Sequence, residues 1–114
     1  MKQNTNKFNA RKITCADGTF DSVKEYRLYL QLKAQMKAAD PDFRVQSIER
    51  QVRYDIAIAG QKIGFYKLDY LVNYASGKKR YFDVKGCRTG AAYQLFKLKK
   101  KIVEAIYQIE IEEV

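Results

Sequence analysis

Residues 67–86 read KLDYLVNYASGKKRYFDVKG, two strand-like segments joined by a short turn at residues 75–77. Apolar and aromatic residues recur through both segments, and a glycine among small residues is typical of a hairpin turn. Asp69, Asp83 and Lys85 interrupt this apolar pattern. A charged side chain on a strand that would otherwise be buried costs free energy unless it is paired or used. The positions of these three residues therefore decide how the segment folds and what it can do.

The length of the turn decides whether the two aspartates meet. In a three-residue loop with Gly77 in the left-handed conformation, Asp69 falls opposite Asp83 across the hairpin. A two-residue loop would instead pair Asp69 with Val84 and send the acids to opposite faces. Because strand side chains alternate, Asp83 and Lys85 share one face. The odd-numbered loop predicts two carboxylates and an ammonium group on the same face.

Two carboxylates and a lysine on one face allow two interpretations. Hard oxygen ligands favour Mg²⁺ or Mn²⁺, so Asp69 and Asp83 with a backbone carbonyl would form a metal site with positions left for water and a phosphate oxygen. Lys85 would then stabilise developing phosphate charge or orient and deprotonate the attacking water. Without metal, one carboxylate of such a pair should have a raised pKa. The alternative is a partly exposed hairpin whose acids and lysines form a salt-bridge lattice of little energetic weight.

The remaining pattern predicts one α/β domain over residues 13–114, preceded by a flexible basic arm over residues 1–12. A turn is expected at 16–19, and a helix from Ser22 to about Ala39, because Ser22 and Glu25 fit a capping box and Pro41 ends the helix. Strands are expected over 45–59, 62–74 and 80–85, then a second helix over about 92–106 and a last strand over 108–112. These elements predict a mixed central sheet of about four strands, an antiparallel meander plus the final strand, flanked by two helices.

Positive charge is concentrated in the second half of the chain. Lys and Arg number 22 against 13 Asp and Glu, and the only acid between Lys78 and Lys101 is Asp83. A field of this kind attracts a polyanion, usually nucleic acid, although a solvated helix face that keeps the protein soluble has the same composition. The cations expected to contact nucleic acid are Lys78, Lys79, Arg80, Arg88, Lys97, Lys100 and Lys101. The second helix is expected to bury the opposite stripe, Ala92, Leu95, Leu98 or Lys99, Ile102, Ala105 and Ile106.

Several classes of protein are excluded by composition. The chain has no histidine, which excludes serine-histidine and cysteine-histidine catalysis and the ordinary zinc enzymes. Its two cysteines match no zinc or redox spacing. No apolar run approaches the roughly 20 residues of a membrane span, and Met1 to Lys12 does not read as a secretory signal. The expectation is a protein of the cytoplasm with no membrane partner.

The arrangement of acids and lysine resembles a known nuclease core. A glutamate in the first helix, an aspartate in one strand and Asp-x-Lys in the next are similar to the PD-(D/E)XK superfamily, which has a restriction-endonuclease-like fold. Segments from Asn9 onward more closely resemble a small family of bacteriophage and prophage proteins of formerly unknown function (DUF1064-like). These segments are Phe20-Asp21-Ser22-x-x-Glu25, Glu49-Arg50-Gln51, Leu68-Asp69-Tyr70, Asp83-Val84-Lys85-Gly86 and Phe96-Lys97-Leu98-Lys99. Leu68 stands where the superfamily motif has proline, which is a frequent variation.

The resemblance implies roles for individual residues. Asp69 and Asp83 would bind the metal together with the backbone carbonyl of Val84, and Lys85 would be the catalytic lysine. Glu25 would be a further ligand or a water-bound base, although the capping box explains it without catalysis. A weaker candidate, Gln51, would lie at the rim.

The expected function is a Mg²⁺- or Mn²⁺-dependent DNA endonuclease that hydrolyses phosphodiester bonds. Similarity to Holliday-junction resolvases implies branched DNA as substrate, a homodimer, and a role in phage recombination or replication in the bacterial host. A non-catalytic nucleic-acid-binding module is the main alternative, and a packaging-associated phage protein is a third. Tyr66, Tyr70, Tyr81 and Tyr93 are candidates to stack on unpaired bases, although tyrosines at strand spacing more often belong to the core or the sheet surface.

Overall fold

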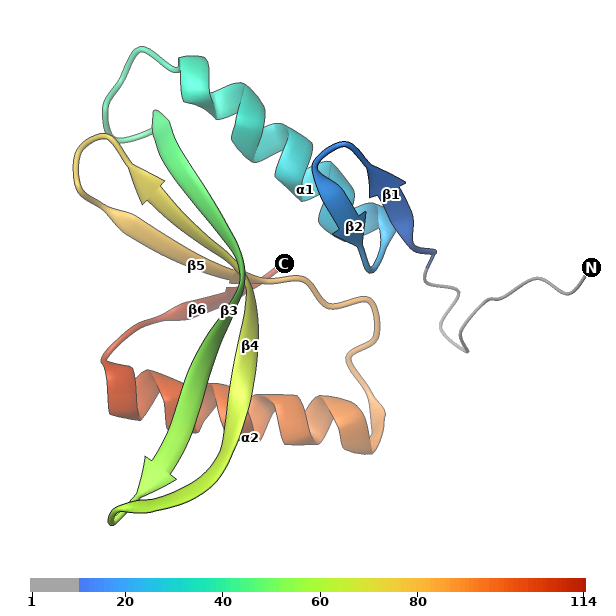
Figure 1. Cartoon of the computed structure of the whole chain (residues 1–114), viewed down its shortest axis with the longest axis vertical. Coiled ribbons are helices and arrows are strands. Elements are labelled where there is room, and N and C mark those ends of the chain that lie inside the picture. The colour runs from blue at the N-terminus through green and yellow to red at the C-terminus, as the bar shows by residue number, and fades with distance from the viewer. Residues whose placement is uncertain (1–10) are drawn as a thin grey trace, which may run out of the picture.

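The computed structural model describes residues 11–114, which form a four-stranded sheet, a small separate hairpin and two helices. Figure 1 shows β3 and β4 as one long hairpin, with α1 beside one half of it and α2 crossing the other. The α/β class, the four-stranded mixed sheet and the two helices are confirmed as predicted. The elements are β1 (Ile13–Cys15), β2 (Gly18–Phe20), α1 (Val23–Ala34), the 3₁₀ turn η1 (Gln35–Lys37), β3 (Val45–Ile58), β4 (Gln61–Tyr74), β5 (Lys79–Asp83), α2 (Gly90–Tyr107) and β6 (Ile111–Glu113).

The sheet has the order β3-β4-β5-β6. The first three strands form an antiparallel meander, and β6 runs parallel to β5 with Tyr81 opposite Ile111. Parallel neighbours need a crossover connection, which α2 provides here. The last strand begins three residues later than predicted, because α2 continues to Tyr107 and Gln108 ends it in the left-handed conformation at φ 57°.

The turn between β4 and β5 is the three-residue loop on which the predicted site depends. Tyr70 pairs with Phe82, and the backbone N–H of Tyr74 donates to the carbonyl of Lys78 at 2.9 Å. Gly77 has φ +96°, a conformation that glycine adopts without a steric penalty. The predicted register is confirmed, and one further step along it places Asp69 opposite Asp83.

Two apolar cores share the sheet between the helices. One core packs α1 against Tyr70, Val72 and Tyr74 of β4. The other packs α2 against Tyr66 and Leu68 of the same strand. All five positions have the same parity along β4, so the twist of the strand turns this face from one helix to the other between residues 68 and 70. Asp69 therefore lies at the boundary between the two cores.

The first helix is shorter than predicted. The α-helix ends at Ala34, a single 3₁₀ turn continues to Lys37, and Ala38 is already extended. Pro41 disfavours helical geometry in the residue before it. The guanidinium group of Arg44 then takes the carbonyls of Ala38 and Ala39, at 3.4 and 3.1 Å, so these residues are held in a loop.

The buried stripe predicted for the second helix is wrong except at Ile102, which is half-buried against the core. Phe96 and Val103 are 8% and 0% exposed, whereas Leu95 and Leu98 are 53% and 57% exposed. Both stripes are apolar, and the aromatic one packs against the sheet, with the Phe96 ring centroid 6.2 Å from that of Tyr66. The helix therefore leaves a leucine face in solvent.

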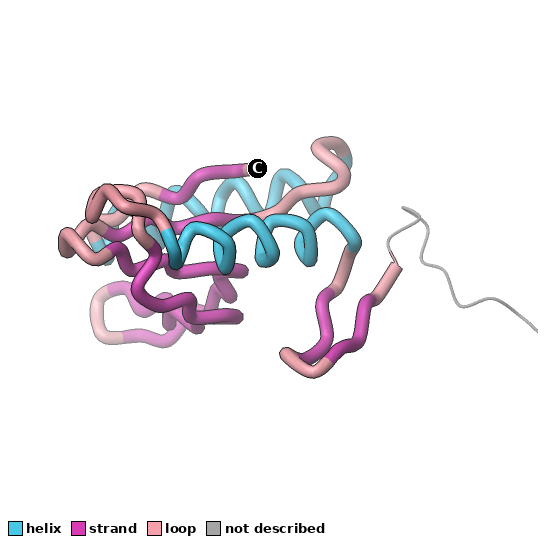
Figure 2. The backbone as a smooth tube through the Cα atoms, turned by 90° about the horizontal axis from the view of Figure 1, so that it is seen from above, coloured by secondary structure: helices cyan, strands magenta, loops and turns pink. Residues whose placement is uncertain are grey.

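Residues 13–20 form a hairpin of two short strands, where the sequence pattern indicated only a turn at 16–19. Figure 2 shows this hairpin set apart from the main sheet, beside the start of α1. Arg50 of β3 fastens it, because its guanidinium group lies 3.6 Å from the Phe20 ring centroid and donates to the carbonyl of Thr19 at 2.7 Å. Arg50 is 31 positions away from Thr19 in the sequence, so a local sequence pattern could not predict the hairpin.

Most of the basic arm predicted at residues 1–12 lies outside the described residues. Of that segment, Arg11 and Lys12 are described and belong to no helix or strand. Within residues 11–114, no helix is both long enough and apolar enough to cross a membrane.

Candidate metal and phosphodiester site

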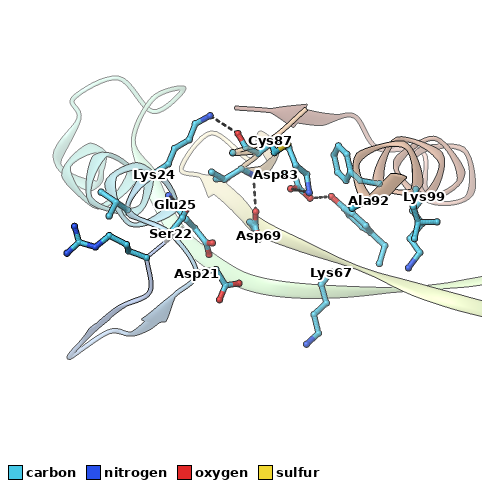
Figure 3. Close-up of a pocket in the computed structure, with 18 residues that line it drawn as sticks. Asp21, Ser22, Lys24, Glu25, Lys67, Asp69, Asp83, Cys87, Ala92 and Lys99 are labelled. Atoms are coloured by element: carbon cyan, nitrogen blue, oxygen red, sulfur yellow. Dashed lines mark hydrogen bonds and ion pairs between the residues drawn. The ribbon is translucent and has the colours of Figure 1, made fainter. Parts of the chain in front are cut away.

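A pocket of about 660 Å³ opens between the start of α1, the middle of β4, the end of β5 and the first turns of α2. Its lining includes Glu25, Asp69, Asp83 and Lys85, so the structure brings the four predicted catalytic residues together. Figure 3 shows the two aspartates between α1, which carries Glu25, and α2, which carries Ala92 and Lys99. The volume is in the range of small-molecule and cofactor pockets.

Asp69 is the most perturbed acid of the pocket. One carboxylate oxygen accepts from the backbone N–H of Val84 at 2.8 Å, and the other accepts from the Gln51 amide at 3.2 Å. Burial, followed by the charge of Asp83, raises the pKa of Asp69 from 3.8 to about 7, although the bond from Val84 lowers it. This is the raised carboxylate pKa expected of two close aspartates without metal.

Asp83 is buried, with 3% of its surface exposed. The Lys85 ammonium lies 3.1 Å from its Oδ1, and the Tyr66 hydroxyl donates to its Oδ2. Burial and the neighbouring Asp83 charge raise the pKa of Tyr66, so the phenol remains a donor. A buried carboxylate is tolerated when an ion pair and hydrogen bonds compensate its lost hydration, as here.

Lys85 lies two residues beyond the end of β5, which stops at Asp83 instead of continuing to Lys85 as predicted. Its position is nevertheless fixed, because its backbone N–H donates to the carbonyl of Val114 at 3.0 Å and the backbone N–H of Val114 donates to the backbone carbonyl of Asp83 at 2.9 Å. The ammonium group lies 3.7 Å from the Phe96 ring centroid. An aromatic face beneath an ammonium attracts it electrostatically, so Lys85 is held between a ring and a carboxylate.

Glu25 makes the backbone half of the predicted capping box, and its side chain lines the pocket. Its backbone N–H donates to the Ser22 hydroxyl at 3.0 Å, which caps α1. Its side chain is 3% exposed and lines the pocket, where Oε2 lies 3.4 Å from the Gln51 amide and 3.8 Å from the Arg50 guanidinium. Burial, then Asp21, raises the pKa of Glu25, and Arg50 opposes the shift.

Gln51, predicted to lie at the rim of the site, is exposed and does not line the pocket itself. It lies in the middle of β3 with φ 52°, between the pairs Arg50–Tyr70 and Val52–Leu68. A left-handed residue other than glycine costs roughly 1–2 kcal/mol. Its amide bridges two acids of the pocket, and both Arg50 and Gln51 reach the Glu25 carboxylate, which the alternation of a regular strand would prevent. Strain of this kind gathers at functional sites.

The donor set suits a hard divalent cation held by few protein ligands. Within residues 11–114, no three histidine, cysteine, aspartate or glutamate side chains form a complete metal-binding group. Mg²⁺ commonly takes one or two carboxylates and keeps several waters. Asp69 and Asp83 match that requirement, and a bound cation would offset both the burial of the ionised Asp69 carboxylate and its repulsion by Asp83, which together raise its pKa. Val84, expected to offer its carbonyl, is seen to donate its N–H to Asp69.

The seven cations predicted to contact nucleic acid do not line the pocket. Arg80 forms a bidentate pair with Glu112, Arg88 lies 3.5 Å from Glu113, and Lys100 lies 3.5 Å from Glu104. The other four, Lys78, Lys79, Lys97 and Lys101, are exposed. The acidic tail and α2 itself therefore neutralise part of the basic segment.

Four other cations line the pocket besides Lys85, and none of them is among the residues predicted to contact nucleic acid. They are Arg11, Lys24, Lys67 and Lys99. Two of them left a signal: Lys67 falls opposite Lys85 in the predicted register, and Lys24 directly precedes Glu25. The ammonium group of Lys24 donates to the carbonyl of Lys85 at 2.9 Å.

The tyrosines proposed to stack on bases are mainly structural. Tyr66 and Tyr70 are 5% and 0% exposed, so their rings belong to the cores. Tyr70 donates to the carbonyl of Glu25 at 2.7 Å and thereby ties α1 to β4 below the pocket. Half-buried Tyr93 donates to Glu113. Tyr81, the fourth candidate, is half-buried against the core that contains Phe96.

Comparison with known proteins identifies the family of this chain. No curated protein matches this chain. No solved structure matches it either. A family model described as "Protein of unknown function (DUF1064)" matches residues 5–112, nearly the whole of the 114-residue chain. The chain therefore belongs to the DUF1064 family.

Proposed function

We propose that this protein is a metal-dependent DNA endonuclease with a restriction-endonuclease-like core of the PD-(D/E)XK type. One observation carries the proposal. The three-residue turn between β4 and β5 places Asp69 opposite Asp83, and the Lys85 ammonium lies 3.1 Å from Asp83 in the same pocket. A salt-bridge lattice on an exposed hairpin would not bury Asp83 to 3% exposure.

Each residue of the pocket has a chemical task in this proposal. Asp69 and Asp83 would hold Mg²⁺ or Mn²⁺. The bound ion would offset negative charge on the scissile phosphate and lower the pKa of a water molecule bound to it. Lys85, fixed over the Phe96 ring, can stabilise negative charge that develops on a phosphate oxygen. Tyr66 donates to Asp83 and so fixes the direction of that carboxylate. Glu25 provides a second acid on the α1 side of the pocket.

The surroundings of the acids suit a phosphodiester substrate. Arg11, Lys24, Lys67 and Lys99 line the same pocket and can contact phosphates on either side of the scissile bond. The net charge of +9 favours approach of a polyanion. Acids that would repel DNA by themselves are thus enclosed by cations that attract it.

The resemblance to small phage nucleases extends the proposal to substrate and setting. Branched DNA such as a Holliday junction would be cut by a homodimer, because a four-way junction offers two symmetric positions. Such an enzyme would act in phage recombination or replication, in the cytoplasm of the bacterial host.

The test is a cleavage assay on branched and linear DNA with Mg²⁺, with Mn²⁺ and with a chelator. We expect cleavage that requires metal and falls by at least about 100-fold in Asp83→Asn and in Lys85→Ala, by the magnitude typical for loss of one transition-state contact. Asp55→Asn, which changes an exposed acid on the same hairpin, is the matched control. Unchanged cleavage in both site variants would refute the catalytic assignment, and binding without cleavage of any substrate would favour the non-catalytic alternative.

A further inference from the structure

An exposed phenylalanine lies next to the pocket and belongs to neither core. Phe65 of β4 is 39% exposed, whereas its neighbour Tyr66 is 5% exposed and packs against α2. Phe65 and Lys67 are two residues apart on one strand and therefore point to the same face. Since Lys67 lines the pocket, this face continues from the pocket along β4.

Cations surround the Phe65 ring. The Arg53 guanidinium lies 4.1 Å from the ring centroid, and the Lys99 ammonium lies 5.9 Å from it. Arg53 pairs with Lys67 across β3 and β4, and it also forms an ion pair with Asp55 at 2.9 Å. Lys99 lines the pocket from α2, as does the exposed Leu95 one turn before it. We call the set Arg53, Phe65, Lys67 and Lys99 the Phe65 platform.

The chemistry of this surface favours single-stranded nucleic acid over other partners. An exposed apolar side chain rimmed by charge marks an interaction site. Rings that accept stacked bases, set among cations that follow the backbone, are the usual means of holding an unpaired strand. The bases of an intact duplex are already stacked on one another, so a duplex would meet the lysines and the arginine but not the ring.

We propose that the Phe65 platform stacks an unpaired base, and that the pocket therefore acts on nucleic acid with a single-stranded segment beside the cleavage point. The inference rests on the nuclease function proposed above and narrows its substrate class to branched DNA that carries unpaired bases, in place of a fully paired four-way junction. Phe65 precedes Asp69 by four residues, about 13 Å along an extended strand. At 3.4 Å per nucleotide of stacked strand, that separation is about four nucleotides.

The test is fluorescence anisotropy with a labelled oligothymidine and with a blunt duplex of equal length, both in chelator and with the Asp83→Asn protein, so that no cleavage occurs. Phe65→Ala should weaken binding of the single strand by roughly tenfold, the usual effect of losing one stacked base, and change duplex binding by less than about twofold. Phe65→Tyr, which keeps a ring, should bind as the parent does. Phe43→Ala removes a phenylalanine that is 62% exposed in the loop before β3 and is the matched control.

Two results would overturn the inference. One is an equal loss of single-strand and duplex binding in Phe65→Ala, and the other is no loss of either. Because binding is measured without metal and on a variant that cannot cleave, failure of the cleavage assay leaves this result intact. Equally, if the protein cleaves DNA but Phe65→Ala binds the single strand as tightly as the parent does, the inference about Phe65 fails and the nuclease function stands.

Discussion

Replacing Asp69 by asparagine should stabilise the folded protein at alkaline pH, although it removes a proposed metal ligand. Burial and the charge of Asp83 raise the pKa of Asp69 from 3.8 to about 7. The folded state therefore binds more protons than the unfolded state between those two values, and stability falls as pH rises from about 4 to about 7. Above pH 7 the full penalty of the ionised carboxylate remains.

The structure sets the size of the effect. A shift of about three pKa units, at 1.36 kcal/mol for each unit, gives an upper estimate of about 4 kcal/mol. Asparagine keeps an oxygen that can accept from the Val84 N–H, but it loses the charge that strengthens this bond and the second oxygen that accepts from Gln51, at a cost of about 1–2 kcal/mol. We expect Asp69→Asn to raise the free energy of unfolding by about 2 kcal/mol at pH 8. At pH 5 the gain should vanish or reverse.

Urea denaturation at pH 5 and pH 8, in chelator, measures this difference directly. Asp55→Asn is the control, because that carboxylate is 60% exposed in a surface ion pair with Arg53 and should contribute less than about 1 kcal/mol at either pH. An NMR titration of the Asp69 carboxyl reports its pKa independently.

The same loss of stability in Asp69→Asn at both pH values would show that burial and the Asp83 charge do not destabilise the ionised Asp69 carboxylate. An ordinary aspartate pKa in the titration would lead to the same conclusion. Either result would remove the reason for expecting a cation between Asp69 and Asp83.

Two other substitutions test the geometry of the site and of α2. Gln51→Gly should change the free energy of unfolding by less than about 1 kcal/mol, because glycine accepts φ 52° without strain. It should also raise the pKa of Asp69 further, because it removes the hydrogen bond from the Gln51 amide that lowers this pKa. A downward shift of the Asp69 pKa in the NMR titration would contradict this expectation. Phe96→Ala should lower the free energy of unfolding by about 3–5 kcal/mol in urea denaturation, whereas Leu98→Ala should change it by no more than about 0.5 kcal/mol. If Leu98→Ala were the more destabilising of the two, the stripe predicted from sequence would be the buried one.

The part of the site that could be predicted from sequence depends on one short turn. Once the loop at residues 75–77 has three residues, alternation and register place Asp69 opposite Asp83 without further information. The conformation of a turn depends on neighbouring residues, and Gly77 indicates this one. The strands, the sheet type and the two helices follow from periodicities that are equally local.

The parts that could not be predicted depend on contacts between distant segments. Two apolar stripes compete on α2, and only packing against Tyr66 selects the one with Phe96. The left-handed conformation of Gln51 has no sequence signal, and the two acids that its amide contacts lie on other elements. The hairpin at residues 13–20 depends on Arg50.

The cations that line the pocket could not be identified from the lysine cluster for a related reason. A cluster of lysines along the sequence indicates a strong local field, but the pocket collects its cations from several elements. Lys67 lies on β4 and Lys99 on α2, 32 positions apart, yet both line it. Arg80 and Arg88, which belong to the sequence cluster, pair instead with the acidic C-terminal residues.

The central claim is that Asp69 and Asp83 share one divalent cation, and calorimetric titration of the protein with Mn²⁺ tests it most directly. We predict one binding site for each chain, lost in Asp69→Asn and in Asp83→Asn but retained in Asp55→Asn. Mn²⁺ binding of undiminished affinity in both site variants, or no binding by the unmodified protein, would contradict the account.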